Sequence, residues 1–224
     1  RLSHLEWTVD NKKLNNNPIF LDNTEKFHKK ISSICFDNLV CRDFYNLEFL
    51  KPNLFNLVEL LVQKDLNYIT LPLVEEATLR DDSDINFVRK ITDILLERYS
   101  CLEINIESDA SAEKIKQVIK PNKNVNFTYD TGNITASNFD HRRYISLLFD
   151  NITNVHLKDR KHNSGPSMKF GYGDTDFNFI FKTLSELNYS NIFTLQMVRG
   201  VEGEEFNYIK DLSHTFKELY EKYF

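Results

Sequence analysis

The feature that most constrains the fold of this chain is a repeated alternation between short apolar segments and longer amphipathic ones. The apolar segments, which are typical of buried strands, are His4–Val9, Leu39–Tyr45, Tyr68–Leu73, Leu102–Glu107, Val125–Tyr129, Thr153–Leu157 and Ile192–Met197. Between them, apolar residues recur at helical spacing, for example over residues 87–95 and 177–187, and a last such stretch covers residues 204–223. Strands that alternate with helices predict right-handed βαβ units and a parallel sheet.

A parallel sheet of this size either stays open or closes into a barrel. No predicted strand is followed by a Gly-x-Gly-x-x-Gly turn, so the sequence gives no support to a dinucleotide-binding sheet. Seven predicted units in 224 residues fall one short of the eight units and roughly 250 residues of a complete (β/α)₈ barrel. We therefore predict a single TIM barrel domain over residues 1–224 whose first β/α unit is missing or disordered.

Composition excludes several classes of protein. The net charge is −5 with both signs mixed along the chain, which argues against a nucleic-acid partner. No apolar run approaches the roughly 18–20 residues that span a bilayer, so no membrane partner is expected. Cys35, Cys41 and Cys101 lack metal-site spacing and read as reduced thiols. These features predict a cytoplasmic protein.

Polar residues at the predicted strand ends carry the functional signal. Glu107, Asp130, His156 and Gln196 end four successive strands. A lone histidine in an apolar strand is usually a core residue, and a lone aspartate before Thr-Gly-Asn is usually a turn former. Together, however, four donors on adjacent strand ends can converge on one ion. Two carboxylates, an imidazole and an amide oxygen suit one divalent Mn²⁺, Mg²⁺, Co²⁺ or Zn²⁺ ion.

Three blocks of sequence resemble a known family. They are residues 129–133 (Tyr-Asp-Thr-Gly-Asn), 155–160 (Val-His-Leu-Lys-Asp-Arg) and 171–177 (Gly-Tyr-Gly-Asp-Thr-Asp-Phe). They resemble the xylose-isomerase-like barrel superfamily, and within it the sugar phosphate isomerase/epimerase family. The similarity runs along nearly the whole chain. It implies a (β/α)₈ barrel that binds a small carbohydrate, and because related barrels often pair, it is compatible with a homodimer.

The resemblance also implies a Glu-Asp-His-Glu site for one divalent metal. Glu107, Asp130 and His156 match the first three positions, and Gln196 replaces the last glutamate. In the family, one glutamate removes a proton beside the substrate carbonyl, the metal stabilises the enediolate, and the other glutamate returns a proton. Glutamine has no useful proton affinity. We therefore expect a sugar or sugar-phosphate isomerase or epimerase with Glu107 as base and Lys158 as a candidate second proton carrier.

Four further residues are candidate substrate ligands. Glu75 and Asn133 are predicted to bond sugar hydroxyls, and Arg160 and Arg199 to hold a phosphate or carboxylate. For each arginine, a surface salt bridge is an equally good interpretation.

Some residues near these motifs have two interpretations. Asp109 either joins the site or caps the following helix. His162 is an extra ligand or, more in keeping with its position, an exposed loop residue. The Gly171-Tyr-Gly173 segment reads first as a turn that leads into a helix capped near Asp176, and second as an active-site lid.

Two other classes of function stay open. A metal-dependent lyase or dehydratase on the same barrel would begin with the same proton abstraction. A catalytically inactive sugar-binding barrel is favoured by Gln196. Apurinic endonucleases, a further relative, need a histidine-rich site that this chain lacks. Finally, Arg1–Ser3 resembles the end of the family's first strand and abuts residues 4–7, which resemble the second strand, so we expect a segment to be absent between Ser3 and His4.

Overall fold

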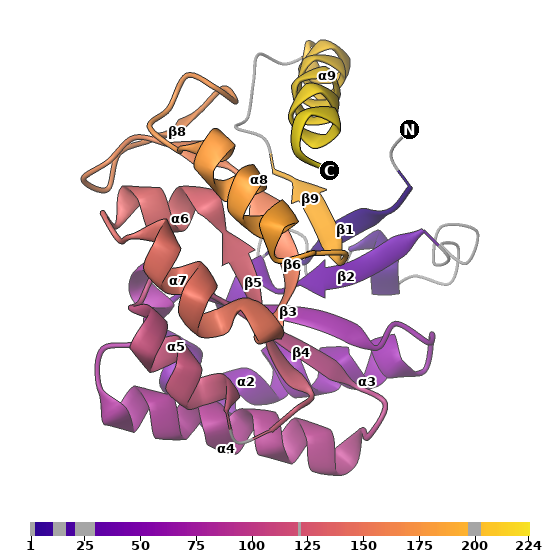
Figure 1. The fold of residues 1–224 in the computed structure, drawn as a ribbon. Coiled ribbons are helices and arrows are strands. Elements are labelled where there is room, and N and C mark those ends of the chain that lie inside the picture. The colour runs from indigo at the N-terminus through magenta and orange to yellow at the C-terminus, as the bar shows by residue number, and fades with distance from the viewer. Residues whose placement is uncertain (1–2, 11–16, 21–29, 121, 197–202) are drawn as a thin grey trace. The chain divides into compact units, whose positions relative to one another are not determined.

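The computed structural model describes residues 3–10, 17–20, 30–120, 122–196 and 203–224 (Figure 1). Its contacts divide the chain into two compact units, residues 1–128 and 129–224. Seven strands form one sheet in the order β1 (Leu5–Thr8), β2 (Ile31–Cys35), β3 (Tyr68–Leu73), β4 (Glu103–Ser108), β5 (Val125–Asp130), β6 (Ile152–Leu157) and β9 (Ile192–Leu195). The helices are α2 (Leu47–Leu50), α3 (Asn56–Val62), α4 (Asp82–Arg98), α5 (Ala112–Ile119), α6 (Thr131–Ala136), α7 (His141–Leu148), α8 (Phe177–Glu186) and α9 (Glu205–Tyr223).

In the first unit, the sheet has one apolar and one polar face. Neighbouring strands from β1 to β5 pair in parallel. Ile69 pairs with Ile104, and both are fully buried. Side chains alternate along a strand and cross-strand partners share a face, so Thr70 and Asn105 lie on the opposite face. Glu107 follows two residues later on that polar face. The polar side chains of paired strands therefore lie side by side on one face of the sheet, and along β4 they continue to Glu107 near the end of the strand.

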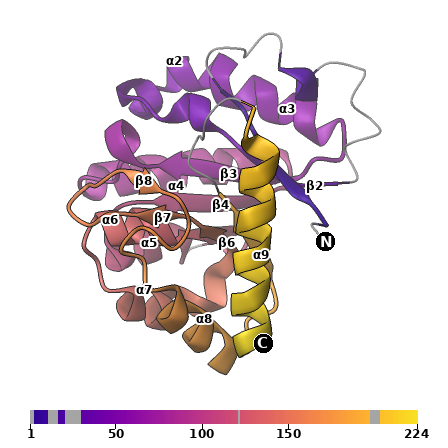
Figure 2. The same cartoon turned by 90° about the horizontal axis from the view of Figure 1, so that it is seen from above.

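The second unit repeats this two-faced arrangement. Parallel pairing of β6 with β9 places Val155 beside Phe193, and His156 beside Thr194 on the other face. The ring of Phe193 stacks on Phe181 of α8 at 5.5 Å and contacts Phe216 of α9 at 5.8 Å. The helices α8 and α9 contact each other, and Figure 2 shows α8 beside the C-terminal end of α9. The aromatic packing thus fixes which face of β6 is left for His156.

Most of the predicted elements are confirmed. The strand β3 has the predicted bounds, β4 is displaced by one residue at both ends, β5 and β6 each differ by one residue at one end, and β9 begins at the predicted Ile192. The predicted end of β9, Met197, lies outside the described residues. The helical stretches correspond to α4, α8 and α9. No helix in the described ranges is long and apolar enough to cross a membrane.

One predicted strand is wrong. Residues 39–45 form two short 3₁₀ turns, Asp37–Leu39 and Arg42–Tyr45, and the strand lies upstream as β2. Leu39 and Phe44 are fully buried, so their apolar character reflects packed turns. The strand itself escaped prediction because its polar face carries Ser33, whose hydroxyl donates to Glu6 Oε2 at 2.5 Å. The apolar run at residues 39–45 therefore corresponds to packed turns and not to a strand.

Candidate active site

Glu107 lies near the end of β4 in the first unit, and its side chain is only 5% exposed. Its partner in the parallel register is Thr128 of β5. The strand β5 then continues for two residues and ends at Asp130. The register therefore places Glu107 beside Thr128, within the first unit.

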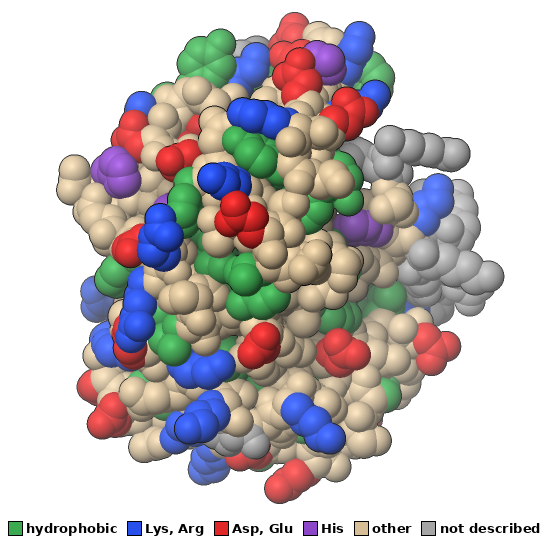
Figure 3. All heavy atoms as spheres, viewed as in Figure 1, with side chains coloured by type: hydrophobic (Ala, Val, Ile, Leu, Met, Phe, Trp, Pro, Cys, Tyr) green, Lys and Arg blue, Asp and Glu red, His purple; other side chains and the backbone are tan. Residues whose placement is uncertain are grey.

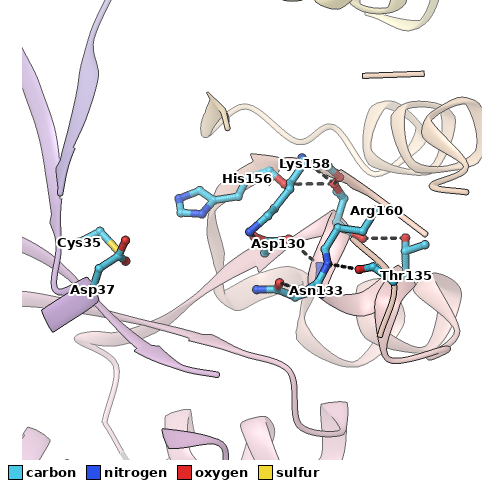
Figure 4. Close-up of polar contacts among 10 residues, drawn as sticks. Cys35, Asp37, Asp130, Asn133, Thr135, His156, Lys158 and Arg160 are labelled. Carbon is cyan, nitrogen blue, oxygen red and sulfur yellow. Dashed lines mark hydrogen bonds and ion pairs between the residues drawn. The ribbon is translucent and has the colours of Figure 1, made fainter. Parts of the chain in front are cut away.

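Asp130 and His156 form a buried pair in the second unit. The two residues are 1% and 0% exposed, and each offers a ligand atom within 4.8 Å of the other. Asp130 Oδ1 accepts the Asn133 backbone N–H at 2.7 Å and caps α6, while Oδ2 lies 3.9 Å from Lys158 Nζ (Figure 4). The interpretation of Asp130 as a turn former is therefore confirmed, whereas its role as a metal ligand stays a prediction.

The Thr-Gly pair that follows Asp130 explains how Lys158 comes so close. The Thr131 hydroxyl donates to the Lys158 carbonyl at 2.7 Å and joins α6 to the end of β6. A Cβ atom on Gly132 would lie 2.9 Å from Lys158 Cγ and 3.0 Å from Arg160 Cγ. Glycine is therefore required where these two cationic side chains cross the helix.

Arg160 and Asn133, both predicted to bind substrate, bond to each other. Arg160 Nη1 donates to Asn133 Oδ1 at 3.2 Å, and Arg160 Nε donates to the Gly165 carbonyl at 3.0 Å. Asn133 is buried, and Arg160 is half-buried. Their role in substrate binding stays a prediction.

Asp159 is a buried carboxylate that the sequence analysis did not single out. Its Oδ2 accepts the backbone N–H groups of Gly171 and Gly173, each at 2.8 Å, and its Oδ1 accepts that of Thr175 at 3.3 Å. The loop therefore wraps around this carboxylate. Asp176 then caps α8 by accepting the Phe179 N–H at 3.0 Å, which confirms the interpretation as a turn followed by a cap. A Gly-x-Gly-x-Thr pattern paired with a strand-end aspartate would have been the signal.

A buried histidine network, also missed, lies behind Asp130. Tyr129 Oη is 2.5 Å from His141 Nδ1, and His141 Nε2 is 3.0 Å from Thr135 Oγ1. Because the Thr135 hydroxyl donates to the Thr131 carbonyl, it must accept from Nε2, which leaves Nδ1 to accept from Tyr129. Burial lowers the pKa of His141 to about 4 and raises that of Tyr129, so both are neutral at pH 7.

Gln196 continues the β9 ladder by donating its backbone N–H to the Leu157 carbonyl at 3.2 Å. Its side-chain Oε1 is buried and has no hydrogen-bond partner among the residues that the structure describes. It lines a cavity of about 30 Å³ with Asp159 and Leu212. A cavity of that size has room for a water, so either a water or a metal ion would satisfy this oxygen.

The remaining predicted residues divide as follows. Glu75 is exposed after β3, and its backbone N–H donates to Asp109 Oδ2 at 2.9 Å. Asp109 therefore ties down this loop, and its interpretation as a cap of α5 is wrong, since the N-cap of α5 is Ser111. His162 is an exposed loop residue as expected. Arg199 lies outside the described residues.

The surface and the thiols agree with the composition. Lys and Arg side chains are interspersed with Asp and Glu side chains over the face drawn in Figure 3. All three cysteines are free, and burial raises the pKa of the Cys35 thiol, so that this thiol stays protonated.

Comparisons with known proteins agree with this architecture. Residues 72–218 match the family described as "Xylose isomerase-like TIM barrel". A stretch of 74 residues is 39% identical to SgbU of Escherichia coli (strain K12), a candidate L-ribulose-5-phosphate 3-epimerase; it covers 30% of this chain and about a quarter (26%) of that protein.

Solved structures extend the similarity to nearly the whole chain. A D-tagatose 3-epimerase-like protein is 14% identical, with a TM-score of 0.68 over 98% of this chain and 90% of its own. The IolI protein with a bound zinc atom is 15% identical, with a TM-score of 0.66 over 99% of each chain. At these identities the likeness shows the fold alone. Together with the family match, it shows that the chain belongs to the xylose isomerase-like TIM barrel family.

Proposed function

We propose that this protein is a divalent-metal-dependent isomerase or epimerase of a sugar or sugar phosphate. The observation that carries the proposal is the buried pair of Asp130 and His156, whose ligand atoms lie within 4.8 Å of each other beside the ammonium of Lys158. A carboxylate and an imidazole held this close together are two of the donor types that divalent ions take in proteins. The names of SgbU and of the tagatose epimerase-like protein support a carbohydrate substrate.

The residues present fit a hard or borderline divalent ion. Asp130 and His156 are suited to hold one ion, we assign the buried Glu107 as a third ligand, and Gln196 adds a buried amide oxygen. This donor set suits Mn²⁺, Mg²⁺, Co²⁺ or Zn²⁺. The zinc atom bound to the similar IolI protein is in keeping with such an ion.

A bound ion would polarise the substrate carbonyl and so make the neighbouring C–H more acidic. Glu107 is the residue that we assign to remove this proton, because it is buried on the polar face of its strand. Lys158 is partly exposed, with 22% of its side chain accessible, and we assign it to hold or return a proton on the substrate side. Gln196 binds but does not exchange protons. These roles favour a one-base isomerisation over an epimerisation by two glutamates.

Metal content and turnover test the proposal. Purified protein is expected to hold about one divalent ion per chain, and both Glu107→Gln and Asp130→Asn are expected to lose it. Glu103→Gln is the matched control, since Glu103 lies on the same strand but is exposed. The metal-loaded protein is then screened with free and phosphorylated ketoses, and the products are separated by stereochemistry.

The outcomes separate the alternatives. Isomerised product supports the proposal, and a dehydrated product would point to a lyase. Protein that retains metal and binds sugar without turnover would favour an inactive sugar-binding barrel, the alternative that Gln196 favours. Protein that neither contains nor binds Mn²⁺, Co²⁺, Zn²⁺ or Mg²⁺ would contradict the proposal.

A further inference from the structure

Arg160 bridges two segments, the helix α6 that Asp130 caps and the turn at Gly165. Its Nη1 donates to Asn133 Oδ1 at 3.2 Å, and its Nε donates to the Gly165 carbonyl at 3.0 Å. One guanidinium therefore joins the first turn of α6 to the turn after β7 (Asp159–Arg160). Figure 4 shows its side chain lying along Asn133.

Asn133 carries this contact onward to Asp130. Its side-chain oxygen accepts from Arg160, and its backbone N–H donates to Asp130 Oδ1 at 2.7 Å. Asn133 is itself 5% exposed. A displacement of Asn133 would therefore change the direction in which Oδ2, the oxygen facing Lys158, points.

We propose that Arg160 is a positioning residue that fixes Asn133, and through it the Asp130 carboxylate, in the geometry needed for metal binding. The effect of Arg160 on metal binding rests on the proposed function. The pair of hydrogen bonds by which Arg160 holds Asn133 and Gly165, called the brace below, does not. Residues that orient a metal ligand typically change metal affinity by roughly ten- to a hundredfold when they are replaced.

The alternative role, a direct ligand of a substrate anion, uses the same side chain differently. An arginine that holds a phosphate presents its paired N–H groups as a fork. Here two of the donors are already bonded to protein acceptors. The planar fork also explains why lysine would not serve, because a single ammonium cannot reach both Asn133 and Gly165 in fixed directions.

Hydrogen exchange of the metal-free protein tests the brace. In Arg160→Met, peptides that cover residues 130–136 are expected to exchange roughly fivefold faster, as for the loss of a net hydrogen bond. Arg160→Lys is expected to behave like Arg160→Met. The control is Arg142→Met on α7, where the guanidinium lies 5.0 Å over the Phe179 ring. Unchanged exchange in Arg160→Met would overturn the proposal. If that variant fails to fold, Asn133→Ser, which removes the side-chain acceptor, is expected to give the same local change.

Titration with Co²⁺, followed by its visible absorption, tests the consequence for metal binding. Arg160→Met is expected to bind Co²⁺ about tenfold more weakly than the parent protein, and Arg142→Met to bind it equally well. Unchanged affinity in Arg160→Met would overturn the positioning role. A raised KM for phosphorylated substrate, with exchange and Co²⁺ affinity unchanged, would assign Arg160 to the substrate instead. A parent protein that binds no Co²⁺ contradicts the proposed function, and the exchange result still decides the brace.

Discussion

Two buried aspartates in the second unit, Asp130 and Asp159, differ in what surrounds their oxygens. Asp159 is 3% exposed, and its two oxygens accept three backbone N–H groups from the loop of residues 171–175. Asp130 is 1% exposed, but one of its oxygens caps α6 while the other faces the Lys158 side chain. Backbone amides cannot move away or exchange protons with a substrate. A carboxylate surrounded by them supports the structure, whereas one that faces side chains is available for chemistry.

The largest effect is expected from Asp159→Ala. This change leaves three backbone N–H groups without their acceptor, and we expect unfolding free energy to fall by roughly 4 kcal/mol. Urea denaturation of the metal-free protein measures it, with the exposed Asp150→Ala as control. A loss below about 1 kcal/mol would show that water replaces the carboxylate and would weaken the contrast with Asp130.

Asp130→Asn is expected to do the opposite. Asparagine caps helices about as well as aspartate, so the stability of the metal-free protein is expected to change by less than about 1 kcal/mol. Co²⁺ affinity is expected to fall by more than the roughly hundredfold that marks the loss of a supporting residue, because a charged ligand itself is removed. If Asp130→Asn destabilised the protein as much as Asp159→Ala does, both aspartates would be structural.

The histidine network connects these two regions, and its sensitivity to acid is the third prediction. The Thr135 hydroxyl, which accepts from His141, lies 3.0 Å from that of Thr175 in the loop around Asp159. Burial lowers the pKa of His141 from 6.5 to about 4, while Asp140 and Asp176 partly oppose this. Protonation therefore favours the unfolded chain.

The stability that His141 contributes is fully present above pH 6.5 and is lost as the pH falls toward 4. The expected loss is roughly 2 kcal/mol over that range, after allowance for partial exposure. Urea denaturation at several pH values measures it, and His141→Gln, which keeps polar contacts but cannot be protonated, is the control. Parallel pH profiles for the two proteins would exclude His141 as the source.

The sequence predicts the strands and the residues at their ends better than it predicts the buried residues that hold them in place. The strand β3 and the positions of Asp130 and His156 near strand ends follow from local alternation, since a strand buried on one face repeats every two residues. Asp159 and His141 could not be found in this way. The side-chain partners of His141 lie six and twelve residues away, and those of Asp159 are backbone groups twelve to sixteen residues away, so neither set shows in the local alternation.

The same limit explains the missed strand β2. Its Ser33 is matched to Glu6, 27 residues away, so the strand lacks the apolar run that local patterns detect. Such pairings between residues distant in sequence form only in the folded tertiary structure. The role of Glu107 as base, and those of Glu75 and Arg160 toward substrate, therefore stay predictions.

Gln196→Glu is expected to have the smallest effect, and it tests the comparison between Asp130 and Asp159 most directly. In the metal-free protein, a carboxylate at this buried oxygen adds negative charge beside Asp159 in the shared cavity, so we expect stability to fall by about 1 kcal/mol. If Gln196 Oε1 faces the ion, the added charge should strengthen Co²⁺ binding by roughly threefold to tenfold, since charged ligands bind divalent ions more tightly than amides. If a water in the cavity satisfies Oε1 instead, Co²⁺ affinity stays unchanged while the loss of stability remains. The two measurements together therefore decide whether Gln196 belongs with Asp130, among the groups available for chemistry, or with Asp159, among those that hold the structure.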